Sequence, residues 1–380
     1  MMRFRQSICA TQIFTSALTR VTLPNTADGG LMAPKYVTNI QILRFFAALS
    51  VALAHIGVAV EEHDQVDSSV FRMVYPFDWG LGVDVFFIIS GFIMYYLMRE
   101  RFGEPGISGK FLRRRLIRVV PLYWACTTLM VASILSAKQL INNNVLDPVH
   151  LIASYLFIPW PRANGEIFPV FSLGWTLNYE IIFYIVFAIA LSMSRRSGLI
   201  FAFLAFSALV AGHMAAPESW WFLHYVGDWI IFEFLIGIAL AAIFLNTDRR
   251  ISPLAAIAFM VVGVLLAVIF YQTGSYTFMP RLVTGGIPAA FIFIGAVFVD
   301  FTPKNRVARW LEVGGDASYA LYLVHAFTAN IVAIIGGRLG LPSLVTFGVG
   351  VVVSVGASVV TYRFFERPIT NFLNQRFGRV

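Results

Sequence analysis

The sequence is poor in charge, in cysteine and in the polar low-complexity tracts that form flexible linkers. Asp, Glu, Lys and Arg make up 13% of the 380 residues, whereas soluble domains average about 25%. The two cysteines, Cys9 and Cys126, lie far apart and fit neither a disulfide framework nor a metal-binding spacing. No long Ser-rich or Pro-rich tract interrupts the chain. These absences exclude a soluble multidomain enzyme, a disulfide-stabilised domain and a disordered protein.

The chain is instead rich in apolar residues, which make up 58% of it. Ten segments are each near the roughly 20 residues that a helix needs to cross a bilayer. They are 40–60, 79–98, 119–137, 172–193, 199–216, 229–246, 253–271, 281–300, 316–335 and 343–363. The sequence therefore predicts an all-α fold, a polytopic transmembrane helix bundle of about ten spans.

The basic residues predict the orientation of this bundle. With the N-terminus in the cytoplasm, most of the 28 Lys and Arg residues fall in inward-facing regions, as the positive-inside rule requires. We expect a poorly ordered cytoplasmic tail over 1–38, a transmembrane domain over 39–368 and a cytoplasmic C-terminal tail over 369–380. Met32 is an alternative start, and the N-terminal tail lacks the features of a signal peptide. The net charge of +8 then reflects topology and contact with anionic lipids rather than nucleic-acid binding.

Ionisable residues inside apolar spans are costly and commonly mark functional sites. This chain has six of them: Arg44, His55, Asp84, Glu180, Glu233 and His325. Arg44 and His55 are eleven residues apart, which places them on one helix face with about 16 Å between them. The alternative for this pair is structural, with Arg44 extending to the inner headgroups and His55 making one interhelical hydrogen bond.

His55, Asp84 and Glu180 are expected at comparable depth in the outer half of the bundle. A carboxylate bonded to one imidazole nitrogen fixes the tautomer and leaves the other nitrogen to take a proton. We therefore expect Asp84 or Glu180 to orient a catalytic His55. A purely structural polar network is the alternative.

A basic run over 110–118 precedes the third predicted span. It acts as a stop signal for membrane insertion. Its arginines can also bind a phosphorylated ligand, because guanidinium groups pair with phosphate in bidentate fashion. The glycines before it lack the spacing of a P-loop, and His63-Asp64 lacks partner ligands, so we predict no metal site.

Six motifs in sequence order resemble those of the acyltransferase-3 family of bacterial membrane O-acyltransferases. In the first, ten residues separate Arg44 from His55, which is the family's signature. The others cover 82–92, 114–123, 172–180 with 183–184, 318–325 and 364–368. The resemblance spans almost the whole chain beyond the N-terminal tail, and the segment 39–49 is most similar to exopolysaccharide-production members.

The resemblance implies transfer of an acyl group, usually acetyl, to a hydroxyl of a cell-surface or exported carbohydrate at the bacterial inner membrane. The donor is acyl-CoA, and no tightly bound cofactor is expected. The acceptor is a carbohydrate or a polyprenyl-linked glycan, and membrane lipids surround the protein. Combined with the residues above, the resemblance assigns the CoA phosphates to Arg113, Arg114, Arg115 and Arg118.

The remaining roles follow from the same combination. Arg44 lines the route of the pantetheine arm or holds a phosphate or the thioester carbonyl. His55 acts as general base or as a transient acyl carrier. Tyr322 or His325 donates to the developing oxyanion. Further substrate or oxyanion candidates from the motifs are Ser90, Trp175 and Tyr319.

Two other classes of protein share part of this pattern. A proton-coupled transporter or exporter of a polysaccharide precursor also places His, Asp and Glu within the membrane, although it should show internal repeats. A non-catalytic scaffold of a polysaccharide-synthesis complex would tolerate loss of His55.

Overall fold

The computed structural model describes residues 34–63, 78–136 and 147–377, apart from the single positions 163, 218, 248, 249, 302 and 304. Throughout the described residues the chain is helical and forms no strand, so the predicted all-α class is confirmed. The α-helices are α2 (Pro34–His63), α4 (Leu81–Met98), α5 (Ile107–Ser136), α6 (Pro148–Tyr155), α7 (Trp175–Leu191), α8 (Arg195–Ala215), α9 (Trp221–Val226), α10 (Phe232–Asn246), α11 (Pro253–Gln272), α12 (Ile287–Val297), α13 (Arg306–Asp316), α14 (Ser318–Arg338), α15 (Ser343–Thr361) and α16 (Arg367–Phe377).

Nine helices in the described part of the chain are long and apolar enough to cross a membrane. They match nine of the ten predicted segments. The other segment, 281–300, forms a shorter apolar helix over Leu282–Val297, which starts with the π-helical turn η4 (Leu282–Gly286) and continues as α12. This helix ends at Val297, and two residues later Val299 pairs with Ile251 in an isolated β-bridge.

The third span begins earlier than the sequence predicts. α5 starts at Ile107, twelve residues before the predicted segment 119–137, and it continues through Pro121. Phe111 is buried in this first part of the helix, where its ring meets the edge of Tyr184 at 5.9 Å. The basic run therefore has helical periodicity, and this periodicity decides which of its arginines face the interior.

α4 is the central helix of the bundle. Glycine lets it approach α10 closely: a Cβ on Gly91 would lie 2.1 Å from the carbonyl oxygen of Phe234, and one on Gly237 would lie 2.2 Å from that of Ile88. Such close approach is typical of helix packing in membranes. Phe234 also stacks on Phe183 of α7 at a centroid distance of 4.3 Å, which joins α10 to α7.

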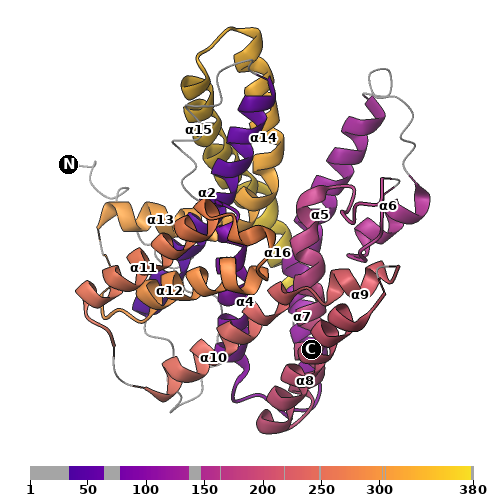
Figure 1. Cartoon of the computed structure of the whole chain (residues 1–380), viewed down its shortest axis with the longest axis vertical. Coiled ribbons are helices and arrows are strands. Elements are labelled where there is room, and N and C mark those ends of the chain that lie inside the picture. The colour runs from indigo at the N-terminus through magenta and orange to yellow at the C-terminus, as the bar shows by residue number, and fades with distance from the viewer. Residues whose placement is uncertain are drawn as a thin grey trace, which may run out of the picture.

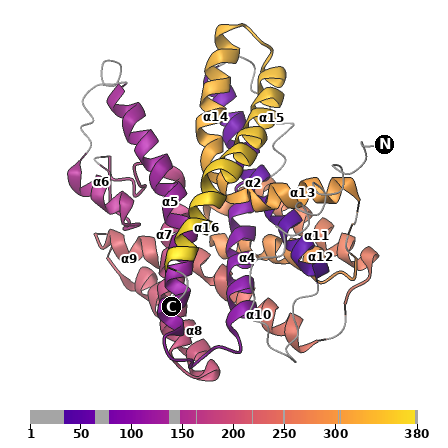
Figure 2. The same cartoon turned by 180° about the vertical axis from the view of Figure 1, so that it is seen from behind.

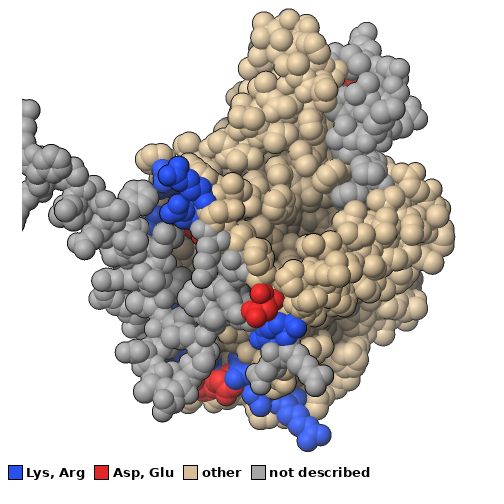
Figure 3. Space-filling model, turned by 90° about the vertical axis from the view of Figure 1, so that its left-hand side faces the viewer, with Lys and Arg blue, Asp and Glu red and all other residues tan. Residues whose placement is uncertain are grey.

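The helices of the two ends of the chain lie side by side. Figures 1 and 2 show α2, α14 and α15 together on one side of the molecule and α5 and α6 on the other. α13 lies across the first turns of α2, where Gln41 donates to Asp316 at 2.8 Å. On the face shown in Figure 3, the charged side chains among the described residues form a few patches between uncharged ones, as expected of a protein embedded in lipid.

Candidate active site

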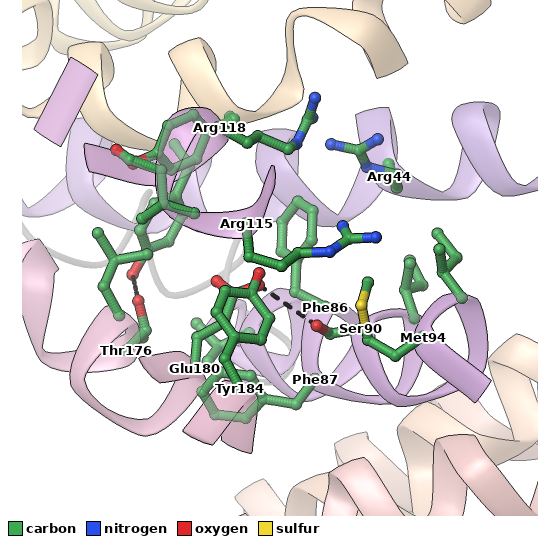
Figure 4. Close-up of a pocket in the computed structure, with 17 residues that line it drawn as sticks. Arg44, Phe86, Phe87, Ser90, Met94, Arg115, Arg118, Thr176, Glu180 and Tyr184 are labelled. Carbon is green, nitrogen blue, oxygen red and sulfur yellow. Dashed lines mark hydrogen bonds between the residues drawn. The ribbon is translucent and has the colours of Figure 1, made fainter. Parts of the chain in front are cut away.

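A cavity of about 120 Å³ lies between α2, α4, α5, α7 and α14. It gathers most of the predicted site residues from five helices that are far apart in the sequence (Figure 4). Its polar and charged lining residues are Arg44, Ser90, Arg115, Arg118, Thr176, Glu180, Tyr184, Tyr319 and Tyr322.

One face of α4 forms the length of this cavity. Val83, Phe87, Ser90 and Met94 all line it, at intervals of three or four residues, so they share one helical face. Met94 lies eleven positions after Val83, which corresponds to about 16 Å of helix. The cavity is therefore a long slot with apolar walls and polar groups at separate levels.

Three arginines concentrate positive charge in this slot. Figure 4 shows the guanidinium groups of Arg44, Arg115 and Arg118 pointing into the same region from α2 and α5. Glu180 is the one carboxylate among the lining residues in the described part of the chain. With three arginines and one carboxylate, the cavity has a net positive charge. The three cations repel one another in this partly buried site, and an anionic ligand would relieve that repulsion.

Acidic groups beside the slot hold these arginines in place. Arg44 donates to Gln41 at 3.2 Å, and Gln41 in turn donates to Asp316. Glu366 lies within electrostatic range of both Arg44 and Arg118. Burial raises the pKa of Asp316, while nearby Arg44 opposes that shift. Acidic groups outside the slot thus stabilise Arg44 and Arg118, in addition to Glu180 within it.

Glu180 is held by two hydroxyl groups. Ser90 donates to Glu180 at 3.3 Å, and Tyr184 also donates to the same oxygen. Elsewhere along the slot, the hydroxyl of Tyr322 lies 2.8 Å from that of Thr176, and it also donates to the carbonyl of Leu173. These bonds fix side chains that line the slot at two levels.

His55 lies beside His325 rather than in the slot. The two imidazole centroids are 5.0 Å apart, and the ring of Tyr322 follows at 6.2 Å from His325. His55 is exposed and His325 is fully buried. The row His55, His325 and Tyr322 thus leads from the side of α2 to the wall of the slot.

Backbone carbonyls fix the tautomers of both histidines. Nδ1 of His55 lies 2.9 Å from Val51 O, and Nδ1 of His325 lies 2.8 Å from Leu321 O. A carbonyl oxygen only accepts, so each Nδ1 carries the proton. In the neutral rings Nε2 is then the basic nitrogen, and that of His325 is buried with no partner among the described atoms. The expectation that Asp84 or Glu180 would orient His55 is therefore not met, because a carbonyl of its own helix performs that task.

Asp84 faces away from the slot, one helical position beyond Val83. Both of its oxygens accept from Arg281, at 3.0 Å from Nε and 3.0 Å from Nη2. The side chain of Asp84 is 1% exposed and that of Arg281 is 32% exposed, so this bidentate ion pair has a buried carboxylate and a partly exposed guanidinium. Arg281 was not among the predicted site residues, although an arginine at the first position of the apolar segment 281–300 was a usable signal.

The predicted donor-binding arginines divide into two pairs. Arg115 and Arg118 line the slot, whereas Arg114 is exposed and Arg113 is half-buried outside it. Residues three apart share a helical face and adjacent residues do not. Of the other candidates, Ser90, Tyr319 and Tyr322 line the slot, while the ring of Trp175 lies under the guanidinium of Arg281 at 5.7 Å. In the part of the chain described here, no three His, Cys, Asp or Glu side chains gather as a metal site would require.

Comparisons with known proteins agree with the motifs. The family profile described as "Acyltransferase domain" matches residues 37–363. The chain is 34% identical to the exopolysaccharide production protein ExoZ of Rhizobium meliloti, over 76% of this chain and 88% of that protein. It is 24% identical to the putative peptidoglycan O-acetyltransferase YrhL of Bacillus subtilis and 22% identical to the O-acetyltransferase OatA of Staphylococcus aureus. These two matches cover 91% and 89% of this chain but 56% and 58% of the relatives. No solved structure matches the chain.

Proposed function

The chain belongs to the acyltransferase-3 family and is a multi-pass membrane acyltransferase, and we propose that it transfers an acyl group from cytosolic acyl-CoA to a carbohydrate hydroxyl. The acyl group in this proposal is acetyl, as in the names of YrhL and OatA. The acceptor is a cell-surface or exported glycan, in line with the name of ExoZ. The membrane is the bacterial inner membrane, where acyl-CoA is available on one side.

The observation that carries the donor assignment is the convergence of Arg44, Arg115 and Arg118 in one slot. Guanidinium groups bind phosphate oxygens in pairs, and acyl-CoA carries phosphates at one end of a long flexible arm. The slot runs along α4 from Met94 to Val83, a length of about 16 Å. An extended pantetheine arm fits this apolar length and carries the thioester toward Tyr322 and the two histidines.

The chemistry follows from the tautomer of His55. The acceptor oxygen attacks the thioester carbonyl carbon, and the carbon–sulfur bond breaks. The hydroxyl proton moves to Nε2 of His55, the basic nitrogen, and ends on the released thiolate of CoA. In the alternative covalent route, Nε2 attacks the thioester carbonyl and CoA leaves as the thiolate, after which the acceptor hydroxyl takes the acyl group from Nε2 and its proton ends on the thiolate. Tyr322, which lines the slot beside His325, donates to the oxyanion in this proposal by turning its O–H away from the carbonyl of Leu173.

The test uses a histidine on the same helix as a control. His63 also lies on α2, is exposed, and bonds through Nδ1 to the carbonyl four residues earlier, at 2.9 Å. In vesicles supplied with radiolabelled acetyl-CoA, His55→Gln should lower the transfer rate by about 10²–10⁴-fold, the usual contribution of a general base. His63→Gln should keep wild-type activity.

Two outcomes would contradict this role. Equal activity in His55→Gln and wild type would exclude His55 from the chemistry. Equal losses in His55→Gln and His63→Gln would mean that the substitutions act on the helix rather than on the reaction. Thermal unfolding of each purified variant in detergent checks that the protein is intact.

A further inference from the structure

A second cavity lies on the opposite side of α4 from the slot. Its volume is about 180 Å³, and it is formed by the start of α4, the end of α11 and the π-helical turn η4. Its charged, hydroxyl-bearing and aromatic lining residues include Asp78, Asp84, Tyr271, Tyr276, Arg281 and Thr284. Nothing in the proposed donor chemistry uses these groups.

The two cavities lie on either side of the first turn of α4. Val83 lines the slot, while Leu81 and Asp84, two residues before it and one after, line the second cavity. Trp175, which lies under Arg281, directly precedes Thr176 in the slot. The second cavity therefore adjoins the end of the slot that is farther from Met94.

The aromatic side chains of the second cavity suit a sugar ring. Tyr271 and Tyr276 stack with their centroids 5.9 Å apart and their planes at 20°. Tyr276 is 58% exposed and Tyr271 is 37% exposed, so both rings are available to a ligand. A pyranose has apolar C–H faces that pack on such rings and hydroxyls around its edge that bond to polar groups. Thr284 and the Asp84–Arg281 pair supply hydrogen-bond donors and acceptors in the same cavity.

The charge of the second cavity is opposite to that of the slot. Asp84 engages the single lining cation, Arg281, through both oxygens. Asp78 adds a further carboxylate, and its oxygen also accepts from Gly80 N at 2.7 Å. With Asp84 matched by Arg281, Asp78 leaves the lining with one net negative charge, which repels phosphates and uronic acids but accepts a neutral sugar.

We propose that the second cavity binds a neutral sugar unit of the acceptor carbohydrate, with its ring against Tyr271 and Tyr276. This proposal rests on the proposed function, since the adjoining slot supplies the acyl group. One helix, α4, then lies between the donor slot and the acceptor cavity, and the acceptor hydroxyl reaches the thioester past the first turn of this helix.

The experiment measures binding and transfer separately on the full-length protein in nanodiscs. The probes are oligosaccharides released from the surface glycans of the bacterium that produces this protein. Mild alkali removes their acyl groups, and they are then separated into a neutral fraction and a uronic-acid-containing fraction. Wild type should bind the neutral fraction more tightly. Tyr276→Ala should weaken that binding about tenfold, the loss of one aromatic contact, whereas Tyr276→Phe should bind like wild type.

The matched control is Phe278→Ala. Phe278 is 70% exposed, lies two residues beyond Tyr276 and is not among the residues that line the cavity, so its loss should leave binding unchanged. Asp78→Asn keeps the oxygen that accepts from Gly80 but removes the charge, and it should narrow the preference for neutral over uronic-acid-containing probes.

Each outcome has one meaning. Unchanged binding in Tyr276→Ala, an equal loss in Phe278→Ala, or a preference of wild type for the uronic-acid fraction would overturn the sugar site. Transfer that proceeds normally in Tyr276→Ala would overturn the sugar site alone. Tyr276-dependent binding of the neutral fraction without any transfer from acetyl-CoA would support the sugar site and overturn the proposed function.

Discussion

The two sides of α4 treat buried charge in opposite ways. On one side Arg44, Arg115 and Arg118 share a slot with a single lining carboxylate, Glu180. On the other side Arg281 is matched by Asp84 in a bidentate pair with both distances at 3.0 Å. The difference separates two uses of arginine within one membrane bundle. A matched pair stabilises the scaffold and shapes a cavity wall, whereas a surplus of cations creates a site that is electrostatically complete only with an anionic ligand.

The largest expected effect is on the matched side. Asp84→Ala leaves Arg281 without its carboxylate, and the cost has about 3–5 kcal/mol, the value for a fully buried pair, as its upper bound, because the Arg281 side chain is 32% exposed. We expect a strongly lowered thermal unfolding midpoint in detergent. Arg281→Ala introduced into the same protein should recover part of the loss, because no buried charge is then left alone. If Asp84→Ala unfolds like wild type, the pair contributes nothing to the scaffold.

A smaller effect is expected in the slot, and it should appear in binding rather than in folding. Arg115→Gln or Arg118→Gln should raise the apparent KM for acyl-CoA, since a lost guanidinium–phosphate contact is worth on the order of 1–3 kcal/mol. Arg114→Gln is the control, because this neighbour carries the same charge on the same helix but is exposed. Transfer in inverted membrane vesicles at varied acetyl-CoA measures the difference. Equal donor KM values in Arg114→Gln and Arg115→Gln would place the CoA phosphates elsewhere.

The smallest effect concerns Glu180, the one carboxylate of the slot. Ser90→Ala removes one of its two hydroxyl donors and leaves Tyr184 in place. The expected loss is roughly 0.5–1.5 kcal/mol, seen as a modest shift of the unfolding midpoint with a small change in donor KM. A loss as large as that of Asp84→Ala would show that Glu180, too, belongs to the scaffold.

The sequence predicted the fold well, because apolar runs of membrane length depend on composition and little on tertiary contacts. The all-α class and nine of the predicted spans are found in the described residues. The sequence did not predict the π-helical turn η4 or the start of α5 at Ile107. Hydropathy detects neither, since polar arginines can lie on one face of a continuous helix.

The site was predicted in part. Motif spacing identified Arg44, Arg115, Arg118 and Glu180, which the structure brings into one slot. Depth along the chain wrongly suggested that Asp84 would meet His55. Depth gives the position of a residue along the helix axis but not the side of the helix on which it lies. Asp84 follows Val83 by one residue and therefore faces Arg281 on another side of α4. Contacts such as that between His55 and His325 join α2 to α14, 270 positions apart in the sequence, and no local pattern reveals them.

The hydrogen bond from His55 to Val51 O also affects the covalent route. With Nδ1 retaining its proton, an acyl group on Nε2 would make the ring an N-acylimidazolium cation rather than a neutral acylimidazole. A cationic ring is the better leaving group, so such an intermediate would pass its acyl group quickly to a sugar hydroxyl, or to water wherever water can enter. The backbone of α2 would thereby control the lifetime of the acyl-enzyme, and hydroxylamine trapping of the labelled acyl group on His55 would measure it.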